Sequence, residues 1–331
     1  MIIDMHAHIV PEGFPTRGTR TSGDGWPLML AQDSGNADLM IGGKKFRTFR
    51  DTAWNPTKRL DDLPNIGMDK QVLSPLPELL MYHLDPRDGA DLATHLNEAI
   101  AGMVKERPDA YYGLGTAPLQ DVGLAIAELE RIKQLGLLGV EVRSNVEGAN
   151  LGDERFRPFF RQAEVLDLSI FVHAYGSTVT DRLPGLPEDA INHLGFPIEC
   201  GLAGASLIWD GVLTECPKLR VCMSHGGGVL TQMLARGDTL YRTREAVAKL
   251  LPEPPMDYAR RMYYDDLAWN VPTLRYLIDS MGASQVTIGT DYSGASVRTI
   301  TPADEFDALG LSEAEREQIS SANALRFLGV E

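Results

Sequence analysis

The sequence is poor in cysteine and in positive charge. Only three cysteines occur in 331 residues, and Cys200, Cys216 and Cys222 show no C-x-x-C spacing. Neither a disulfide framework nor a zinc ribbon is expected from this pattern, and we interpret them as free thiols in a reducing compartment. Lysine and arginine number 31 against 46 acidic residues, which gives a net charge of −15. Because phosphate binding needs clustered basic residues, this balance argues against a nucleic-acid partner.

Long hydrophobic runs are also missing. The sequence has no run of 18 or more apolar residues and no basic segment leading into an apolar one near its start. We therefore predict neither membrane association nor a secretory signal, and a cytoplasmic location is the default expectation. No glycine-rich fingerprint follows the first apolar segment, which disfavours a dinucleotide-binding or phosphate-binding sheet.

From residue 62 onward, short apolar segments alternate with amphipathic ones. The strands predicted after the opening segment cover residues 71–74, 112–114, 139–142, 168–173, 219–224, 262–265 and 285–289. The predicted helices cover residues 86–106, 122–135, 153–165, 198–215, 229–250, 272–281, 302–309 and 312–328. Eight strands with helices between them indicate an α/β fold, a closed (β/α)8 TIM barrel, with a doubly wound open sheet as the alternative.

A polar segment rich in glycine and proline, residues 11–62, separates the first strand from the repeating units. It is too long for an ordinary connection between a strand and a helix. Within it, residues 38–49 alternate around Gly42-Gly43, which is typical of a β-hairpin. We predict a single barrel domain over residues 1–331, in which 11–62 form a small insertion flap over the active-site face.

His6 and His8 lie at the end of the first strand. Side chains alternate along a strand, so these two imidazoles are expected on one side, with Ile3, Met5 and Ala7 on the other. Two imidazoles on one side make half of a metal site. On its own, however, an H-x-H pair is more often solvated or part of the core.

Three more polar residues follow predicted strands. His173 ends the fifth strand, His225 ends the sixth and Asp291 follows the eighth. In a barrel the carboxyl ends of all strands meet at the face where active sites are built. Taken singly, such a histidine is more often structural and such an aspartate more often a helix cap. Five of these residues at four strand ends indicate a common site.

Together these residues resemble the amidohydrolase superfamily. The resemblance is greatest to the branch that holds 2-amino-3-carboxymuconate-6-semialdehyde decarboxylase and related metal-dependent decarboxylases. It extends along the whole chain, including the insertion. The motifs that carry it are His6-x-His8, His173, His225-Gly226-Gly227-Gly228, Gly289-Thr290-Asp291-Tyr292, Lys45-Phe46-Arg47 and Asn323-Ala324-Leu325-Arg326-Phe327-Leu328.

The resemblance implies that His6, His8, His173 and Asp291 bind one divalent metal ion, with no organic cofactor. Three imidazoles, a carboxylate and a water suit zinc, and manganese is the alternative. The fourth strand, residues 139–143, contains no lysine, so the carbamylated lysine that bridges two metals in other amidohydrolases is not expected.

Further roles come from the same resemblance. His225 would be a base outside the ligand set, and Arg47 would bind a substrate carboxylate. Arg236 would reach the site of a neighbouring subunit, which implies a homodimer. Tyr175 stands where the family decarboxylase has a tryptophan, and Ser293 stands where the family usually has proline. These two departures leave the substrate open.

We therefore predict a metal-dependent decarboxylase of a small unsaturated or aromatic carboxylic acid in aromatic-compound catabolism. It would use hydroxide generated on the metal with His225, and Asp291 would also move a proton. One alternative is a hydrolase or hydratase of a related ring-cleavage or cyclic substrate at the same site. Another is a barrel that only binds a partner, because fold alone does not determine function.

Overall fold

The structure is a computed structural model that describes residues 1–331 except 16–24, 177–184, 186, 295–299 and 331. Eight parallel barrel strands succeed one another along the chain, and the third is broken into two pieces by Leu114. They are β1 (Ile3–Ile9), β5 (Lys70–Pro75), β6 (Tyr111–Gly113) with β7 (Gly115–Thr116), β8 (Gly139–Arg143), β11 (Ser169–His173), β12 (Val221–Met223), β13 (Tyr263–Asp265) and β14 (Val286–Thr287).

The ring of strands is closed. Each strand pairs in parallel with the next one in sequence, and β14 returns to β1 through parallel bridges that join Asp4 to Ile288 and Ala7 to Tyr292. Backbone hydrogen bonds hold this last seam, among them those from the Met5 amide to the Ile288 carbonyl at 2.7 Å and from the His8 amide to the Tyr292 carbonyl at 2.9 Å. The predicted (β/α)8 barrel is thereby confirmed, and the open sheet is excluded.

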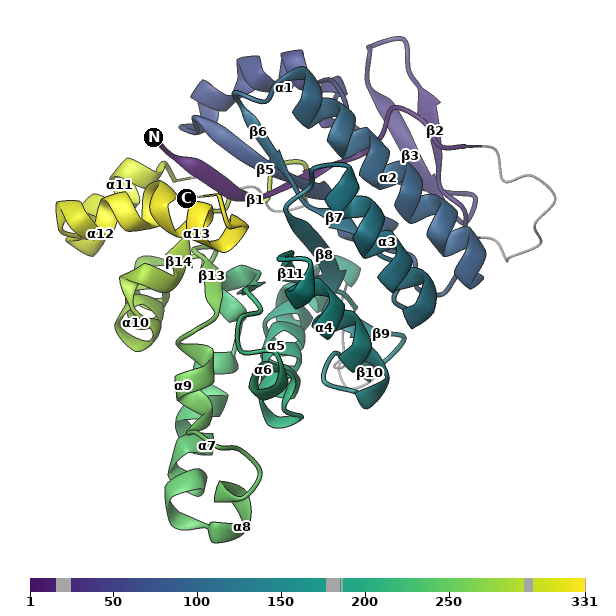
Figure 1. The fold of residues 1–331 in the computed structure, drawn as a ribbon. Coiled ribbons are helices and arrows are strands. Elements are labelled where there is room, and N and C mark those ends of the chain that lie inside the picture. The colour runs from purple at the N-terminus through teal and green to yellow at the C-terminus, as the bar shows by residue number, and fades with distance from the viewer. Residues whose placement is uncertain (16–24, 177–184, 186, 295–299, 331) are drawn as a thin grey trace.

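Helices surround the barrel (Figure 1). The α-helices are α1 (Pro56–Asp62), α2 (Pro86–Glu106), α3 (Val122–Gln134), α4 (Arg157–Val165), α5 (Glu188–Trp209), α6 (Val212–Glu215), α7 (Leu230–Thr243), α8 (Glu245–Ala248), α9 (Pro255–Ala259), α10 (Val271–Met281), α11 (Pro302–Leu309), α12 (Glu313–Glu317) and α13 (Asn323–Leu328). Shorter 3-10 turns are η1 (Asp51–Ala53), η2 (Leu63–Ile66), η3 (Pro77–Leu79), η4 (Glu154–Phe156), η6 (His225–Gly227) and η7 (Ala283–Gln285), and η8 (Gln318–Ala322) is a π-turn.

Three predicted helices differ from the observed ones. The helix expected over 198–215 begins earlier, at Glu188, and runs through Pro197 before it stops at Trp209. Gly211, with a left-handed φ of 82°, then separates it from α6. The helix expected over 229–250 breaks at Arg244, whose backbone is extended, and the one expected over 312–328 contains the π-turn η8. Apolar periodicity alone does not predict where these helices begin and break.

The insertion forms a three-stranded antiparallel sheet. The predicted hairpin is confirmed as β3 (Ala37–Ile41) and β4 (Lys44–Phe49), joined by Gly42 and Gly43 with φ of 57° and 73°. A third strand, β2 (Leu28–Ala31), pairs with β3 and was not predicted. Figure 1 shows this sheet beside the barrel, next to α2. The division of the chain into one domain with a flap at 11–62 stays a prediction.

A β-bulge in β1 decides which side chains enter the barrel. Two residues, Met5 and His6, lie opposite the single residue Val72 of β5. Met5 therefore packs in the same interior cluster as Phe171, and the His6 ring also contacts the Phe171 ring, with 5.0 Å between centroids. The expected alternation, with Met5 and His6 on opposite sides, is wrong because a bulge shifts the pleat by one residue.

The amino-terminal end of the barrel is closed by the last helix. Ala324, Phe327 and Leu328 of α13 pack with Ile3 and Met5 of β1 in one buried cluster. Figure 1 accordingly shows the two chain termini on the same part of the molecule. The barrel interior is thus filled on this side, and polar side chains collect at the opposite end.

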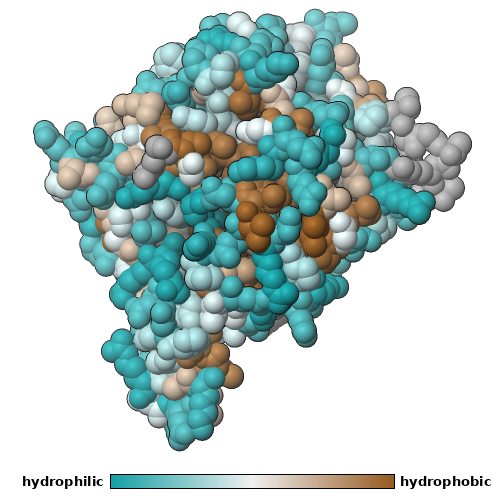
Figure 2. All heavy atoms as spheres, in the orientation of Figure 1, coloured by the Kyte–Doolittle hydropathy of each residue, from teal (hydrophilic) through white to brown (hydrophobic). Residues whose placement is uncertain are grey.

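Helices α7 and α8 extend away from the barrel (Figure 1). The surface in this view is mainly hydrophilic, with hydrophobic residues gathered near its centre (Figure 2). Within the described part of the chain, no helix combines the length and the apolar composition that crossing a membrane requires.

Candidate metal centre

Four side chains converge at the carboxyl ends of the strands. One ligand atom from each of His6, His8, His173 and Asp291 lies within 4.8 Å of the others, and all four residues are buried. The Nε2 atoms of His6 and His8 are 3.0 Å apart. Asp291 Oδ1 lies 3.3 Å from Nε2 of His8 and 3.7 Å from Nε2 of His6. The structure therefore brings together the residues that the sequence analysis grouped.

The second nitrogen of each imidazole is held by a hydrogen bond. Nδ1 of His6 donates to Asp265 Oδ2 at 2.6 Å, and Nδ1 of His173 donates to the Ala174 carbonyl at 2.7 Å. Nδ1 of His8 donates to the Pro75 carbonyl at 3.0 Å. Since a carboxylate or carbonyl only accepts, the proton is on Nδ1, and each Nε2 keeps its lone pair for a metal ion.

A divalent ion fits this donor set. Nε2 of His173 is buried and has no hydrogen-bond partner in the described structure, which an ion would provide. Burial and the neighbouring His6 and His225 rings hold the pKa of His173 well below its ordinary value. Burial opposes ionisation of Asp291, but the neighbouring imidazoles of His8, His6 and His225 together outweigh it and keep the pKa of Asp291 below the usual value. A neutral imidazole and an ionised carboxylate are the forms that bind a metal.

The backbone is left-handed at two of the site residues. Asp291 has a φ of 55° and His225 a φ of 53°. Residues other than glycine seldom adopt such values, although aspartate and histidine do so more often than most. Gly289 lies close to the same seam, where an added Cβ would come 2.9 Å from Cβ of His6. The strained turns aim the Asp291 carboxylate and the His225 ring at the strand ends.

His225 lies beside the four candidate ligands without being one of them. Its ring centroid is 5.0 Å from that of His173 and 5.3 Å from that of His6. The Phe196 ring of α5 stacks on the His225 ring, with 5.7 Å between centroids. Burial, with a contribution from His6, lowers the pKa of His225 to about 4. The ring is therefore neutral near pH 7 and able to accept a proton.

Two buried acids of the site were missed by the sequence analysis. Asp265 ends the seventh strand and accepts the hydrogen bond from His6. Glu141 lies on the fourth strand, with Oε2 3.6 Å from Nδ1 of His8, and neither of its oxygens has a hydrogen-bond partner in the described structure. Asp265 could have been found, because it has the same placement at a strand end as His173 and His225. Glu141 could not, because an acid inside an apolar strand gives no such signal.

Arg47 contacts the loop that follows the eighth strand, whereas the Tyr175 ring packs against Arg143. Arg47 on β4 donates from Nη1 to the Ser293 carbonyl at 3.3 Å, two residues beyond Asp291, so the insertion carries it to the loop that holds a candidate ligand. The guanidinium of Arg143 lies 3.3 Å from the centre of the Tyr175 ring. One face of Tyr175 is therefore covered by a buried cation.

Arg236 is not brought to the site of its own chain. It is exposed on α7, which extends away from the barrel (Figure 1). In the part of the chain that the structure describes, it forms no hydrogen bond or ion pair with the four candidate ligands. A role at a neighbouring subunit would require a second copy of the chain.

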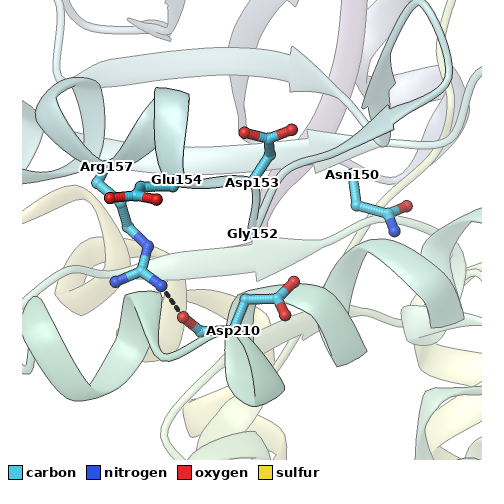
Figure 3. Close-up of a pocket in the computed structure, with 6 residues that line it drawn as sticks. All are labelled: Asn150, Gly152, Asp153, Glu154, Arg157 and Asp210. Atoms are coloured by element: carbon cyan, nitrogen blue, oxygen red, sulfur yellow. Dashed lines mark hydrogen bonds between the residues drawn. The ribbon is translucent and has the colours of Figure 1, made fainter.

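Two surface cavities lie outside the ligand cluster. A cleft of about 370 Å³ runs between β4 and the loop after β14, and Arg47 and Ser293 line it. A second pocket of about 380 Å³ is lined mainly by acids and by Arg157, which donates to the Asp210 carbonyl (Figure 3). The second pocket shares no residue with the cluster and contains no histidine. Its lining residues are Asn150, Gly152, Asp153, Glu154, Arg157 and Asp210.

A closed (β/α)8 barrel with a His-x-His pair on the first strand, histidines after the fifth and sixth and an aspartate after the eighth defines a class of metal-dependent barrel proteins. The family model described as "Amidohydrolase" matches residues 3–330. The chain belongs to this family, as its resemblance indicated.

Individual relatives point to decarboxylases. The 2-amino-3-carboxymuconate-6-semialdehyde decarboxylase of Dictyostelium discoideum is 35% identical over 99% of this chain and 92% of its own length. The IDCase of Metarhizium anisopliae superposes with a TM-score of 0.81 and 20% identity, over 99% of this chain and 97% of that one. The 5-carboxyvanillate decarboxylase of Novosphingobium aromaticivorans, solved with manganese and 4-hydroxy-3-methoxy-5-nitrobenzoic acid, has a TM-score of 0.71 and 25% identity, over 82% and 79%.

The family and the type of enzyme predicted from the sequence are therefore confirmed. The relatives are carboxy-lyases, and the site is suited to a divalent metal.

Proposed function

We propose that this protein is a metal-dependent, non-oxidative decarboxylase of a small unsaturated or aromatic carboxylic acid in aromatic-compound catabolism. The observation that carries the proposal is the ring of His225 beside four convergent ligand atoms, in a chain whose relatives are decarboxylases. No organic cofactor is required.

His6, His8, His173 and Asp291 would hold one divalent ion. When bound, such an ion lowers the pKa of water enough to supply hydroxide near neutral pH and polarises an oxygen of the substrate. Zinc fits the three imidazoles and one carboxylate. Manganese is the alternative, because it is the metal found in the 5-carboxyvanillate decarboxylase structure.

The protein's own residues would bind the acid and move protons. His225 accepts a proton from water at the site, and the Phe196 ring stacked on it limits the orientations that its imidazole can adopt. Asp291 would pass a proton as well as hold the ion, and its position beside His6 and His8 supports this role. Arg47 would bind a substrate carboxylate through its planar guanidinium, and the aromatic ring of Tyr175 would form part of the pocket wall.

We also propose a homodimer in which Arg236 of one chain reaches the site of the other. The extension of α7 away from its own barrel and the exposure of Arg236 support this arrangement. A cytoplasmic location is part of the same proposal.

Release of carbon dioxide tests the proposal. Protein reconstituted with Zn2+ or Mn2+ is incubated with hydroxybenzoic acids and with conjugated unsaturated dicarboxylic acids, and evolved carbon dioxide and the organic product are quantified. We expect stoichiometric carbon dioxide and a product that has lost one carboxylate. A product that retains every carboxylate would instead establish the hydrolase or hydratase.

The His225→Ala variant separates the base from the ligands. It should retain a full complement of metal while turnover falls by about 100-fold or more, as expected on removal of a general base. Loss of metal from this variant would show that His225 is a ligand and that the assigned role is wrong. A full metal complement in a wild-type protein without turnover on any acid of the panel would favour a binding protein.

A further inference from the structure

The buried carboxylate of Asp265 accepts hydrogen bonds from two parts of the site at once. Oδ2 accepts from Nδ1 of His6 at 2.6 Å and from the backbone amide of His225 at 3.0 Å. Oδ1 accepts from the backbone amides of Gly226 at 2.9 Å and Leu267 at 3.2 Å. The residue is fully buried, and both oxygens are occupied.

The two amides after the sixth strand form a small anion-binding nest. His225 and Gly226 have left-handed φ values of 53° and 61°, which turn consecutive N–H groups toward the same carboxylate. The glycines that follow are needed for space as well as for backbone conformation. An added Cβ on Gly228 would come 2.0 Å from the Pro197 carbonyl oxygen, and one on Gly227 would come 2.8 Å from the Tyr264 ring. The turn is thus fixed in the shape that receives Asp265.

We infer that Asp265 is a positioning residue that fixes, through one carboxylate, both the tautomer of the metal-binding His6 and the place of the His225 turn. Metal binding and the location of the base then depend on the same side chain. The inference rests on the proposed function only for the role of His225. Its effect on the metal does not depend on which acid is the substrate.

The geometry requires a carboxylate at this position and excludes an amide. In an Asp265→Asn variant, an amide group that faces His6 presents N–H to an Nδ1 that already carries a proton. His6 could relieve the clash only by moving its proton to Nε2, which removes the lone pair that binds the metal. In the opposite orientation, the side-chain NH2 of the asparagine faces the backbone N–H groups of Gly226 and Leu267. These two donors then have no acceptor.

Metal affinity measures the first half of the inference. We expect the Zn2+ dissociation constant of Asp265→Asn, obtained by competition with a chromophoric chelator, to rise about 10- to 100-fold. Glu128→Gln is the matched control. Glu128 is a buried acid on α3 that accepts from Asn97 at 2.7 Å and from Thr94 at 3.2 Å. Its replacement should lower thermal stability but leave Zn2+ affinity within about 3-fold of wild type.

Nuclear magnetic resonance measures the second half and covers the case in which Asp265→Asn does not fold. In Zn2+-loaded wild-type protein, His6 should show an Nδ1 proton resonance far downfield, as expected for a short hydrogen bond to a carboxylate. In folded Asp265→Asn this resonance should disappear and the ring signals of His225 should shift, whereas Glu128→Gln should show neither change.

An unchanged Zn2+ affinity in Asp265→Asn, unmoved His225 signals in that variant, or an Nε2-protonated His6 in the wild-type protein would overturn the inference. None of these readouts requires turnover, so they remain interpretable if the proposed reaction is wrong.

Discussion

The two histidines of the first strand are supported in opposite ways. Behind His6 lies Asp265, which receives hydrogen bonds from the ring and from backbone amides. Behind His8 lies Glu141, equally buried, whose two oxygens have no hydrogen-bond partner in the described structure, while the His8 proton goes to the Pro75 carbonyl. Two acids with the same burial therefore have different surroundings.

The pKa values of the two acids diverge accordingly. Burial raises the pKa of both, but His6, His225 and the Gly226 amide together outweigh it and hold the pKa of Asp265 below its ordinary value. For Glu141 burial dominates, because the opposing charge of His8, the Ser74 hydroxyl and His6 are together too weak, and the pKa rises to about 7. At equal burial, the hydrogen-bond donors that face a carboxylate therefore decide whether it is ionised.

Removal of Asp291 should have the largest effect, because its Oδ1 lies beside both histidines. In Asp291→Ala the site loses its carboxylate ligand, so we expect loss of bound metal and a fall in activity of about 1000-fold or more. Metal content by mass spectrometry and carbon dioxide release would measure this. A variant that keeps stoichiometric metal would show that His6, His8 and His173 bind the ion without Asp291.

Arg47→Ala tests the side of the site that faces the insertion. We expect KM for the acid to rise about 10-fold or more while kcat changes less, because binding of a carboxylate is lost. Arg50→Ala is the matched control, since Arg50 follows the same strand but its guanidinium pairs with Asp62 at 2.5 Å. Steady-state kinetics on both variants decide the matter. An unchanged KM in Arg47→Ala would contradict the assigned role.

Glu141→Gln tests whether the buried acid next to His8 contributes to metal binding. Since Glu141 does not hold the His8 proton, its replacement should change Zn2+ affinity by less than about 3-fold, unlike Asp265→Asn. A loss of Zn2+ affinity as large as that of Asp265→Asn would show that Glu141 supports His8 as strongly as Asp265 supports His6.

The same variant should reveal the pKa of Glu141 in metal-free protein. A pKa raised from 4.5 to about 7 means that the folded chain keeps its proton where the unfolded chain has lost it. Glu141 therefore stabilises the protein fully below pH 4.5, and this contribution declines as pH rises to about 7. The difference in unfolding free energy between wild type and variant should fall by on the order of 3 kcal/mol over that range, measured by urea denaturation at several pH values. A flat difference would show that Glu141 is ionised throughout.

Asn270→Ala should have the smallest effect and serves as an exposed reference site that contacts neither acid directly. Asn270 caps α10 by accepting from the Thr273 amide at 2.9 Å. Loss of this cap should lower the free energy of unfolding by about 1 kcal/mol. Zn2+ affinity should stay at the wild-type value, so a shift in affinity would mean that general destabilisation, rather than ligand support, governs the metal site.

Much of the barrel could be predicted because its signals are local. Each barrel strand is a short apolar segment, and helices such as α2 begin with a capping aspartate and a proline that the sequence displays, here Asp85 and Pro86. The breaks at Gly211 and Arg244 and the helix through Pro197 were missed, because packing against distant elements decides whether a helix continues.

The candidate ligands were grouped correctly because strand ends of a barrel meet in space wherever they fall in the sequence. The bulge at Met5 and His6 was not predictable, since it is defined by the register against Val72 on another strand. The role of Asp265 was equally hidden, because it depends on where the amides of His225 and Gly226 point.

Helix α13 closes the amino-terminal end of the barrel, so the barrel is not a channel open at both ends. Phe327 and Leu328 seal its floor against Ile3 and Met5, so a reactant cannot arrive through one mouth while carbon dioxide departs through another. We therefore expect any substrate to approach from the carboxyl ends of the strands, where His6, His8 and His173 lie.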